Sequence, residues 1–389
     1  SARCDHALVA LPRGSGSATS ELLLLGGVDE GRCRADVWVS RGSGLGVSWE
    51  RRSEGAPWAA RSGHGAVALR RARGAKKEEA ENEIVLLGGA GSSSIYCDVW
   101  RSSDAGRSWE LVVEEAPWKP RYGHCTLVVG GVTESTAPSD EQVIVLFAGV
   151  GLGRMLNDVW RSRDSGATWL CATRSAPWEP RAAAAAAATR RGHLVLAGGR
   201  GENGCLGDVW VSQDLGATWE LSRGGPTPRS GASLLAMPSC RADRGAGKEQ
   251  EEMLLLFGGF NGLRYLSDTW CSKPEGSEEK SQLGLSWEPL ASQAGFEARY
   301  CHRTVVVEPN LILLLGGHGA AGAFCDVWAS PAPKLWRSKA WALLLLGRRL
   351  TILQGISAEV WRDWVLPHLL PALALSPGSV GSYRRAGRF

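Results

Sequence analysis

The feature that most constrains this chain is one pattern that occurs six times. A pair of small residues, the second always Gly, is followed after eight residues by Asp, then Val or Thr, then Trp. The pairs are Gly26-Gly27, Gly88-Gly89, Ala148-Gly149, Gly198-Gly199, Gly258-Gly259 and Gly316-Gly317, and the triplets begin at Asp36, Asp98, Asp158, Asp208, Asp268 and Asp326. Because the offset never changes, we expect six copies of one structural unit.

Each copy is expected to contain four short strands. An Arg opens the first, a run of apolar residues ending at the small pair forms the second, and Asp-Val-Trp begins the third. The fourth carries Trp49, Trp109, Trp169, Trp219 or Trp287. Four strands per repeat predict an all-β fold, a six-bladed β-propeller of four-stranded antiparallel blades.

One window conflicts with this scheme. Ala182–Ala188 is an unbroken run of Ala, which intrinsic propensity alone would make helical. The repeat places the same residues on a first strand. We follow the repeat, because six copies in register outweigh one window of propensity.

The pattern ends near Trp336. We expect a propeller over residues 1–336 and a basic C-terminal tail over 337–389, irregular or partly helical, whose only acids are Glu359 and Asp363. Ala342–Gly347 resembles a second strand, so a broken seventh blade is the alternative. The apolar stretch Trp364–Leu375 is short and contains two prolines, so no membrane span is expected.

Composition narrows the class of partner. The net charge is +4, and basic residues of the repeats are mixed with acids, which argues against nucleic-acid binding. The ten Cys form no Cys-X-X-Cys pair, so we expect free thiols rather than a disulfide framework. Together with the absence of Asn-X-Ser/Thr sequons, this favours a cytoplasmic location. We expect a monomer.

Two families share these motifs. The paired Gly, the later aromatic and the start Arg61-Ser-Gly-His64 resemble kelch repeats, as in the central domain of galactose oxidase, over residues 3 to about 336. The turn Ser212–Trp219, with Ser162–Trp169 and Ser102–Trp109, is similar to the Asp-box of sialidase-like propellers. Both resemblances imply a propeller.

Strand direction sorts the loops onto two faces. The start of strand one, the eight-residue loops between strands two and three, and the end of strand four share one face, which is the candidate binding face. The Asp-box turns and the charged insertions Arg70–Glu83, Thr133–Gln142 and Ser239–Glu252 belong to the other. The eight-residue loops keep their length while their sequences vary, so they are where we look for function.

An Arg at the start of every repeat lies on the candidate face. Several guanidinium groups around a channel mouth would suit an acidic partner. Alternatively, each bonds carbonyls or a carboxylate between blades, which its occurrence in all copies favours. The series is Arg3, Arg61, Arg121, Arg181, Arg229 and Arg299.

A His follows three residues after the Arg in four copies, at His6, His64, His124 and His302; the other two have Ala184 and Ala232. Imidazole is a frequent metal ligand, but no carboxylate or thiol stands beside these residues at ligand spacing, so we predict packing and no metal. His64, His124 and His302 remain candidate contacts on the binding face.

Three connectors between repeats read Ala-Pro-Trp and end at Trp58, Trp118 and Trp178. An aromatic residue on an exposed connector can anchor a partner, and packing over the neighbouring blade is the equal alternative.

These observations predict a non-catalytic kelch-type propeller that serves as a protein-interaction scaffold through its Arg- and Trp-bearing face, without cofactor. No asymmetric catalytic set is visible. The alternative is a sialidase-like or sugar-epimerase-like carbohydrate-active propeller, or a glycan-binding module, and Asp29, Glu30, Glu179, Glu202 and Glu297 are the acids that keep it open.

Overall fold

The computed structural model describes residues 1–11, 21–41, 48–71, 81–130, 142–222, 224–238, 252–274, 285–307, 311–331 and 349–350. The chain divides into two compact units, Ser1–Thr351 and Ile352–Phe389. The second unit and nearly all of the expected tail, 337–389, lie outside the described residues. The described residues form strands and turns and contain no helix.

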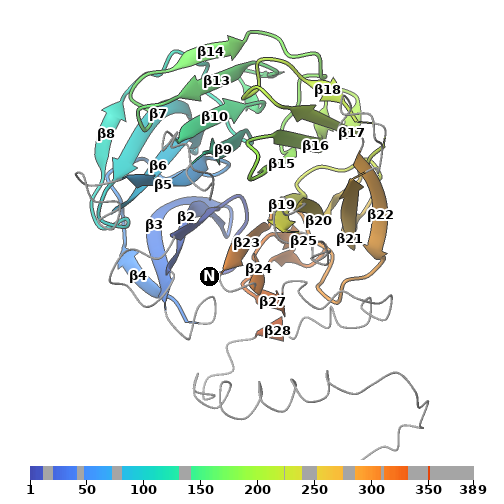
Figure 1. Ribbon diagram of the computed structural model, residues 1–389. Coiled ribbons are helices and arrows are strands. Elements are labelled where there is room, and N and C mark those ends of the chain that lie inside the picture. Colours follow the sequence, from blue (N-terminus) through green and yellow to red (C-terminus); the bar gives the residue numbers. More distant parts are fainter. Residues whose placement is uncertain are drawn as a thin grey trace, which may run out of the picture. The chain divides into compact units, whose positions relative to one another are not determined.

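The first unit is a six-bladed β-propeller of four-stranded antiparallel sheets, as the repeat predicts (Figure 1). Every sheet uses its strands in chain order, from the innermost strand outward. Blade 1 contains β1 (Ala7–Leu11), β2 (Glu21–Asp29), β3 (Arg32–Arg41) and β4 (Glu50–Ser53); blade 2 contains β5 (Gly65–Arg71), β6 (Glu81–Ala90), β7 (Ile95–Ser102) and β8 (Glu110–Val113); blade 3 contains β9 (Cys125–Val129), β10 (Val143–Phe147), β13 (Val159–Ser162) and β14 (Leu170–Thr173).

The remaining three blades follow the same plan. The run of alanines forms a strand, so the repeat and not the helix propensity decided its structure. Blade 4 contains β15 (Ala185–Ala188), β16 (Leu194–Gly201), β17 (Gly204–Ser212) and β18 (Glu220–Leu221); blade 5 contains β19 (Ser233–Pro238), β20 (Glu252–Phe260), β21 (Tyr265–Pro274) and β22 (Leu285–Ala291); blade 6 contains β23 (Arg303–Val307), β24 (Leu311–Leu315), β27 (Val327–Pro331) and β28 (Arg349–Leu350).

The blades close into a ring around an axis lined by their first strands. Each first strand contacts the first strand of the next blade, and β23 of blade 6 contacts β1 of blade 1. Backbone hydrogen bonds join these two blades, from Arg3 N to Phe324 O and from Gly317 N to Arg3 O, both at 3.0 Å. Blades 1 and 6 are therefore joined by backbone hydrogen bonds, and neither contributes a strand to the sheet of the other.

Apolar side chains fill the space between blades. One such cluster joins Leu23 and Leu25 of β2 to Ile84 and Leu86 of β6, with Trp58 between them, and a similar cluster occupies every interface around the ring. The second strands are buried on both faces, which explains their continuous apolar sequences. Packing between repeats, not within one repeat, buries this core.

The small pairs give each second strand a bulge. Both residues of every pair have positive φ, from 51° to 61° at the first and from 94° to 109° at the second. In four blades strand pairing resumes after the bulge, so most of the eight-residue loop continues the hairpin. In blades 3 and 6 it forms a separate ladder, with β11 (Val150–Gly151) and β12 (Arg154–Met155), and β25 (His318–Gly319) and β26 (Gly322–Ala323). The third strands therefore begin earlier than Asp-Val-Trp in those four blades.

The expected Asp turns between third and fourth strands are present. The Asp164 carboxylate accepts hydrogen bonds from the Ser162 hydroxyl at 2.9 Å and from the Thr168 amide and hydroxyl at 2.8 and 2.6 Å. Asp104 and Asp214 make equivalent bonds. These carboxylates are occupied by their own turns, which supports the structural role proposed from the sequence.

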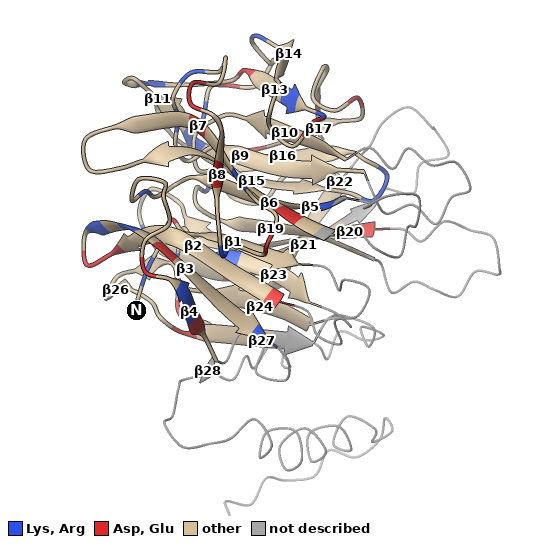
Figure 2. Ribbon diagram, turned by 90° about the vertical axis from the view of Figure 1, so that its left-hand side faces the viewer, with Lys and Arg blue, Asp and Glu red and all other residues tan. Residues whose placement is uncertain are grey.

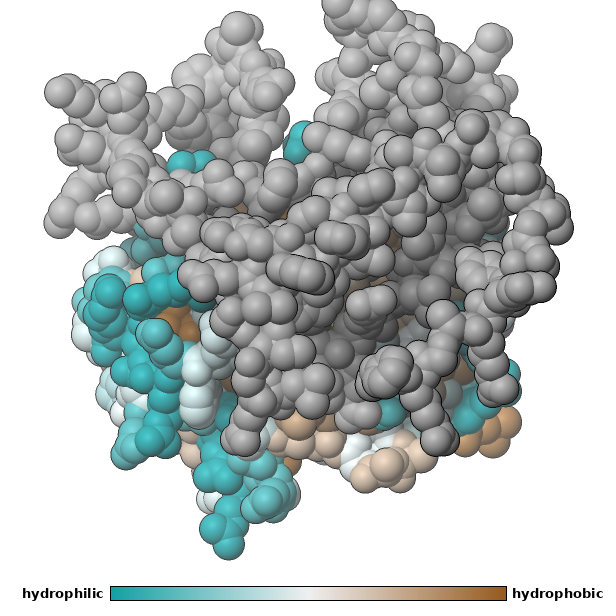
Figure 3. Space-filling view, turned by 90° about the horizontal axis from the view of Figure 1, so that it is seen from below, coloured by the Kyte–Doolittle hydropathy of each residue, from teal (hydrophilic) through white to brown (hydrophobic). Residues whose placement is uncertain are grey.

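Charged residues lie mostly at strand ends, in turns and on outer strands, whereas the inner parts of the blades are largely uncharged (Figure 2). A view from below the orientation of Figure 1 shows hydrophilic residues together with smaller apolar areas on the described surface (Figure 3).

Candidate functional site

Six residues form a closed ring of backbone hydrogen bonds around the propeller axis. Each has positive φ, from 49° to 60°, and its N–H donates to the carbonyl of the equivalent residue in the preceding blade. Five of the bonds measure 2.7 to 2.9 Å and the sixth, from Asp5 N to Cys301 O, measures 3.4 Å. We call this the inner ring: Asp5, Gly63, Gly123, Ala183, Gly231 and Cys301.

Two further rings surround it. The residue before each inner-ring position forms an antiparallel bridge with the first residue of its blade's eight-residue loop. The turn ring is Cys4, Ser62, Tyr122, Ala182, Ser230 and Tyr300; the loop ring is Val28, Ala90, Val150, Arg200, Phe260 and His318. Each blade therefore has three residues at the same end of the axis, one in each ring.

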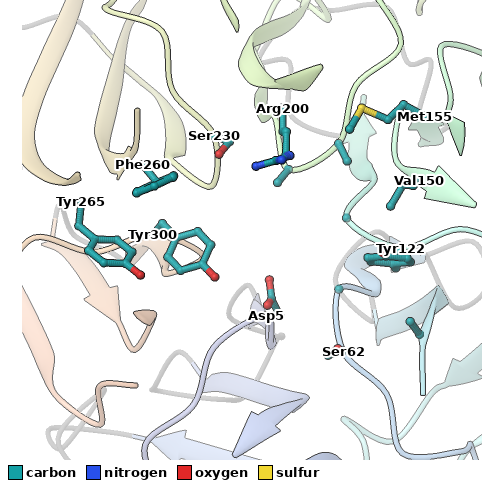
Figure 4. Close-up of a pocket in the computed structure, with 15 residues that line it drawn as sticks. Asp5, Ser62, Tyr122, Val150, Met155, Arg200, Ser230, Phe260, Tyr265 and Tyr300 are labelled. Carbon is teal, nitrogen blue, oxygen red and sulfur yellow. The ribbon is translucent and has the colours of Figure 1, made fainter. Parts of the chain in front are cut away.

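A pocket of about 470 Å³ lies inside these rings, within the size range of small-molecule sites. All six blades contribute to its lining, from Asp5 of blade 1 to Tyr300 of blade 6, and Met155 and Tyr265 add to the wall from their loops (Figure 4). The pocket is therefore the candidate functional site, on the face selected from strand direction.

The pocket wall is chemically asymmetric although its backbone is not. Asp5 and Arg200 are the only acid and the only Lys or Arg among the three rings. Blades 5 and 6 supply three aromatic rings, and the ring centroids of Phe260, Tyr265 and Tyr300 lie 5.2 to 6.2 Å from one another. A binding site is expected to break the symmetry of a repeat scaffold, and this pocket does.

The thiols of Cys4 and Cys301 lie beside the Asp5 carboxylate. Burial raises the pKa of Cys301 well above its ordinary value, and burial raises that of Cys4 to about 12; in both cases the Asp5 charge and a hydrogen bond to Asp5 add to the shift. Both thiols therefore stay protonated at neutral pH and donate to the carboxylate. Every cysteine among the described residues is a free thiol, as expected.

The six arginines that begin the repeats are buried and bond the framework of the propeller, which is the structural alternative considered for them. Arg61 is fully buried, and its guanidinium bonds both oxygens of Asp98 at 2.5 and 2.7 Å and the Gly88 carbonyl at 2.8 Å. Its own carbonyl accepts the Gly27 N–H of the preceding blade at 3.0 Å. We call this arrangement the Arg–Asp staple: the Arg side chain bonds its own blade, and the Arg backbone bonds the preceding one.

The staple recurs with Arg3, Arg121, Arg181, Arg229 and Arg299, none more than 4% exposed. Burial alone would raise the pKa of Asp158, but hydrogen bonds from Arg121 and Trp160 outweigh it and leave that pKa lowered. Because the guanidinium groups are buried and paired, the burial favours the structural alternative over contact with a partner.

The histidines are buried between blades. His6, His64 and His302 are at most 2% exposed and His124 is 8% exposed. Burial, with nearby arginines adding to it, lowers the pKa of His6, His124 and His302 to about 3 and that of His64 well below its ordinary value. They are neutral at physiological pH and, as placed, do not reach a partner.

These histidines pack against the small pair of the preceding blade. A Cβ on Gly26 would lie 3.0 Å from Cε1 of His64, so His in one blade requires Gly in its neighbour. Blade 4 has Ala184 instead of His, and blade 3 correspondingly has Ala148 instead of Gly. Blade 5 also has Ala232 instead of His, but blade 4 keeps Gly198, so Gly is present opposite either residue whereas Ala148 stands opposite an Ala only.

The connector tryptophans are also buried. Trp58, Trp118 and Trp178 are each 1% exposed, and they meet Trp109, Trp169 and Trp219 edge to face at 5.9 to 6.0 Å between ring centroids. Packing over the neighbouring blade is therefore their structural role. Contact with a partner through these three side chains is not compatible with this burial.

The residues that line the pocket were mostly overlooked in the sequence. Arg200, Phe260 and Tyr265 lie in the eight-residue loops, where function was expected. Asp5 was not predicted, because the repeated Arg3 and His6 surround it and it does not itself recur in the other copies. The sequence does contain a signal: repeat one reads Arg3-Cys-Asp-His6, whereas three of the other copies have Gly at the Asp position and the remaining two have Ala and Cys. The acids Asp29, Glu30, Glu179, Glu202 and Glu297 do not line the pocket.

Comparison with protein-family models gives no match for this chain, and comparison with curated proteins gives none either. The kelch and Asp-box resemblances therefore rest on the motifs alone. Within the described residues no cluster of three or more His, Cys, Asp and Glu is placed to hold a metal ion. A search of the same residues found no helix able to span a membrane.

Proposed function

We propose that this chain is a non-catalytic propeller that binds a protein partner through the face around the pocket. One observation carries the proposal: Leu152 and Leu263 are 73% and 92% exposed at the tips of loops in blades 3 and 5. Exposed apolar side chains on rigid hairpins are typical anchors for a partner.

Several features support this interpretation. The residues that repeat in every blade are used for folding, while the loops around the pocket have constant length and variable sequence. Tyr122, on the pocket wall in blade 3, is also 39% exposed. Loops on a rigid ring can hold such side chains in place at little entropic cost when a partner binds.

The pocket chemistry supports a role without catalysis. A glycosidase of the usual kind needs two carboxyl groups on opposite sides of the scissile bond, and Asp5 is the only acid in the described pocket lining. If purified chain hydrolysed sialosides or other glycosides, and Asp5→Asn abolished the turnover, the carbohydrate-active alternative would replace this proposal.

The binding face is tested by matched Leu variants. The double variant Leu152→Lys/Leu263→Lys changes the two loop tips, and Leu111→Lys/Leu221→Lys changes two leucines that are 46% and 58% exposed on outer strands. We expect affinity capture from cells that express the chain to lose specific partners only with the first variant. Equal retention of every partner by both variants would show that the loop face is not the interface.

A further inference from the structure

Asp5 and Arg200 are two charged residues on the wall of one pocket. No ion pair joins either side chain to another described residue. The equivalent positions in the other blades hold Gly, Ala or Cys in the inner ring and Val, Ala, Phe or His in the loop ring. The two charges are therefore departures from the repeat, and the framework does not require them.

The conformation of Asp5 also points to a role other than folding. Its φ is 52°, in the left-handed region, and blades 2, 3 and 5 place Gly at the same position. Gly adopts this conformation without strain, whereas a side chain there carries a cost. Ala183 and Cys301 have the same conformation in blades 4 and 6, so the conformation alone does not distinguish Asp5. Strained residues of this kind are frequent at functional sites, and Asp5 is the one of the three that brings a charge to the pocket wall.

Aromatic rings line the pocket together with Asp5. Tyr300 and Asp5 both point into the cavity in Figure 4, with Tyr265 and Phe260 behind Tyr300. Burial, with the nearby Cys301 and Asp5 adding to it, raises the pKa of Tyr300 to about 12, so its hydroxyl stays neutral. A carboxylate beside neutral aromatic rings suits an ammonium group, through both charge and cation–π attraction.

Arg200 supplies the opposite chemistry from blade 4. Its side chain is exposed to the pocket, and its neighbours Ala182 and Ala183 leave space around it. In Figure 4 its guanidinium extends over the cavity, between Ser230 and Met155. An unpaired guanidinium in this setting suits a carboxylate.

We propose that the pocket binds a small organic zwitterion, with its ammonium group at Asp5 and the tyrosines and its carboxylate at Arg200. The pocket volume of about 470 Å³ accommodates a molecule of this size. The ligand is either a free amino-acid-like compound or the C-terminal Lys of a peptide, which presents the same two groups. This inference does not depend on the proposed protein partner, because a free compound satisfies it.

Three linear probes separate the two charges. The first is 6-aminohexanoate, which carries both groups; hexylamine lacks the carboxylate and hexanoate lacks the ammonium. By isothermal titration calorimetry in low salt we expect 6-aminohexanoate to bind at least about tenfold more tightly than either of the others, because each charge pair contributes separately. Equal affinities for all three probes would overturn the proposal.

Variants assign each charge to its residue. Asp5→Asn should reduce 6-aminohexanoate affinity to that of hexanoate for the native protein, and Arg200→Gln should reduce it to that of hexylamine. Asn tolerates positive φ and Arg200 is exposed, so both variants should fold with an unchanged melting temperature. Unchanged affinity in either folded variant would refute that residue's role.

A third variant tests whether Asp5 serves the ligand rather than the fold. Asp5→Gly gives blade 1 the residue of blades 2, 3 and 5, and we expect unchanged or slightly higher stability with binding lost. Retained binding would contradict the proposal. Comparing 6-aminohexanoate with an acetylated tetrapeptide ending in Lys then identifies the source: tighter peptide binding indicates a peptide C-terminus, and weaker peptide binding indicates a free zwitterion.

Discussion

Arg121 and Arg200 are arginines of neighbouring blades near the same end of the axis, but their surroundings differ. Arg121 is fully buried and bonds Asp158, Ala148 O and Lys119 O at 2.7 to 3.1 Å. Arg200 is exposed and lines the pocket, and no described residue forms an ion pair with it. The first recurs in every blade and the second occurs once.

The difference between these two arginines shows which residues of a ring of blades serve folding and which serve binding. A residue needed at every interface between blades must occur in every copy, so the repeated Arg, Asp, Gly and Trp report folding. A ligand in the central pocket contacts each blade differently, so binding residues differ from copy to copy. The repeated residues attract attention in the sequence, but the exceptions identify the site.

The largest effect is expected from breaking a staple. Arg121→Ala should lower the free energy of unfolding by about 3–5 kcal/mol, because it leaves the Asp158 carboxylate buried without its partner. Arg51→Ala is the matched control, because Arg51 pairs with Glu54 and both side chains are exposed, so the substitution should cost at most about 1 kcal/mol. Urea unfolding midpoints measure both, and similar midpoints for the two variants would contradict the distinction.

A smaller, graded effect is expected from pH. The buried histidines have folded-state pKa values lowered to about 3 from an ordinary 6.5, so between these values the unfolded chain binds more protons than the folded one. Stability should therefore be complete above pH 6.5 and fall as the pH drops toward 3, by at most about 1.4 kcal/mol per pH unit for each histidine.

Urea midpoints between pH 7.5 and 4.5 measure this slope. His6→Ala, which gives blade 1 the residue of blades 4 and 5, should flatten it. A slope that is unchanged in this variant would show that His6 is not kept neutral by burial.

The close approach of the repeat histidine to the small pair of the preceding blade predicts that substitutions at Ala184 and Ala148 are coupled. Ala184→His alone should destabilise the chain by about 1–3 kcal/mol, because the new imidazole would meet the Cβ of Ala148. Adding Ala148→Gly restores the His–Gly contact found between other blades and should recover most of the loss. Thermal unfolding of the two single variants and the double variant measures the coupling, and simple additivity would disprove the shared space.

The smallest effect is expected in the pocket wall. Arg200→Ala should change the free energy of unfolding by no more than about 0.5 kcal/mol, because the side chain is exposed and makes no ion pair with a described residue. The measurement is the same urea titration used for Arg121→Ala. A loss comparable to that of Arg121→Ala would place Arg200 in the framework and remove the contrast between the two regions.

Much of the fold could be predicted because the repeat encodes it locally. The constant spacing from small pair to Asp-Val-Trp fixes strand order and register within a blade, and it placed Ala185–Ala188 on a strand despite the propensity of Ala for helices. The bulge after the small pair was not foreseen, so the third strands of four blades begin earlier than expected. Positive φ at both residues of the pair lets the hairpin continue beyond it.

The candidate site was predicted less well. The correct face followed from strand direction, and the eight-residue loops do supply Arg200, Phe260 and Tyr265 to the pocket. Whether the repeated Arg, His and Trp face solvent or a neighbouring blade depends on packing between repeats. Spacing along the chain contains no information about that packing, and these residues proved to be buried.

The sequence by itself determined the plan of the blade, its turns and the number of copies, because each depends on residues close together in the chain. It did not determine the fourth strand of blade 6, Arg349–Leu350, which comes from the segment expected to be a tail. Only the tertiary structure decided which residues meet at the axis. Closing the ring brings Cys301 against Asp5 and places Asp5, Tyr300 and Arg200 around one cavity. These residues lie in different repeats, and their meeting depends on how six blades pack around a centre rather than on any one repeat.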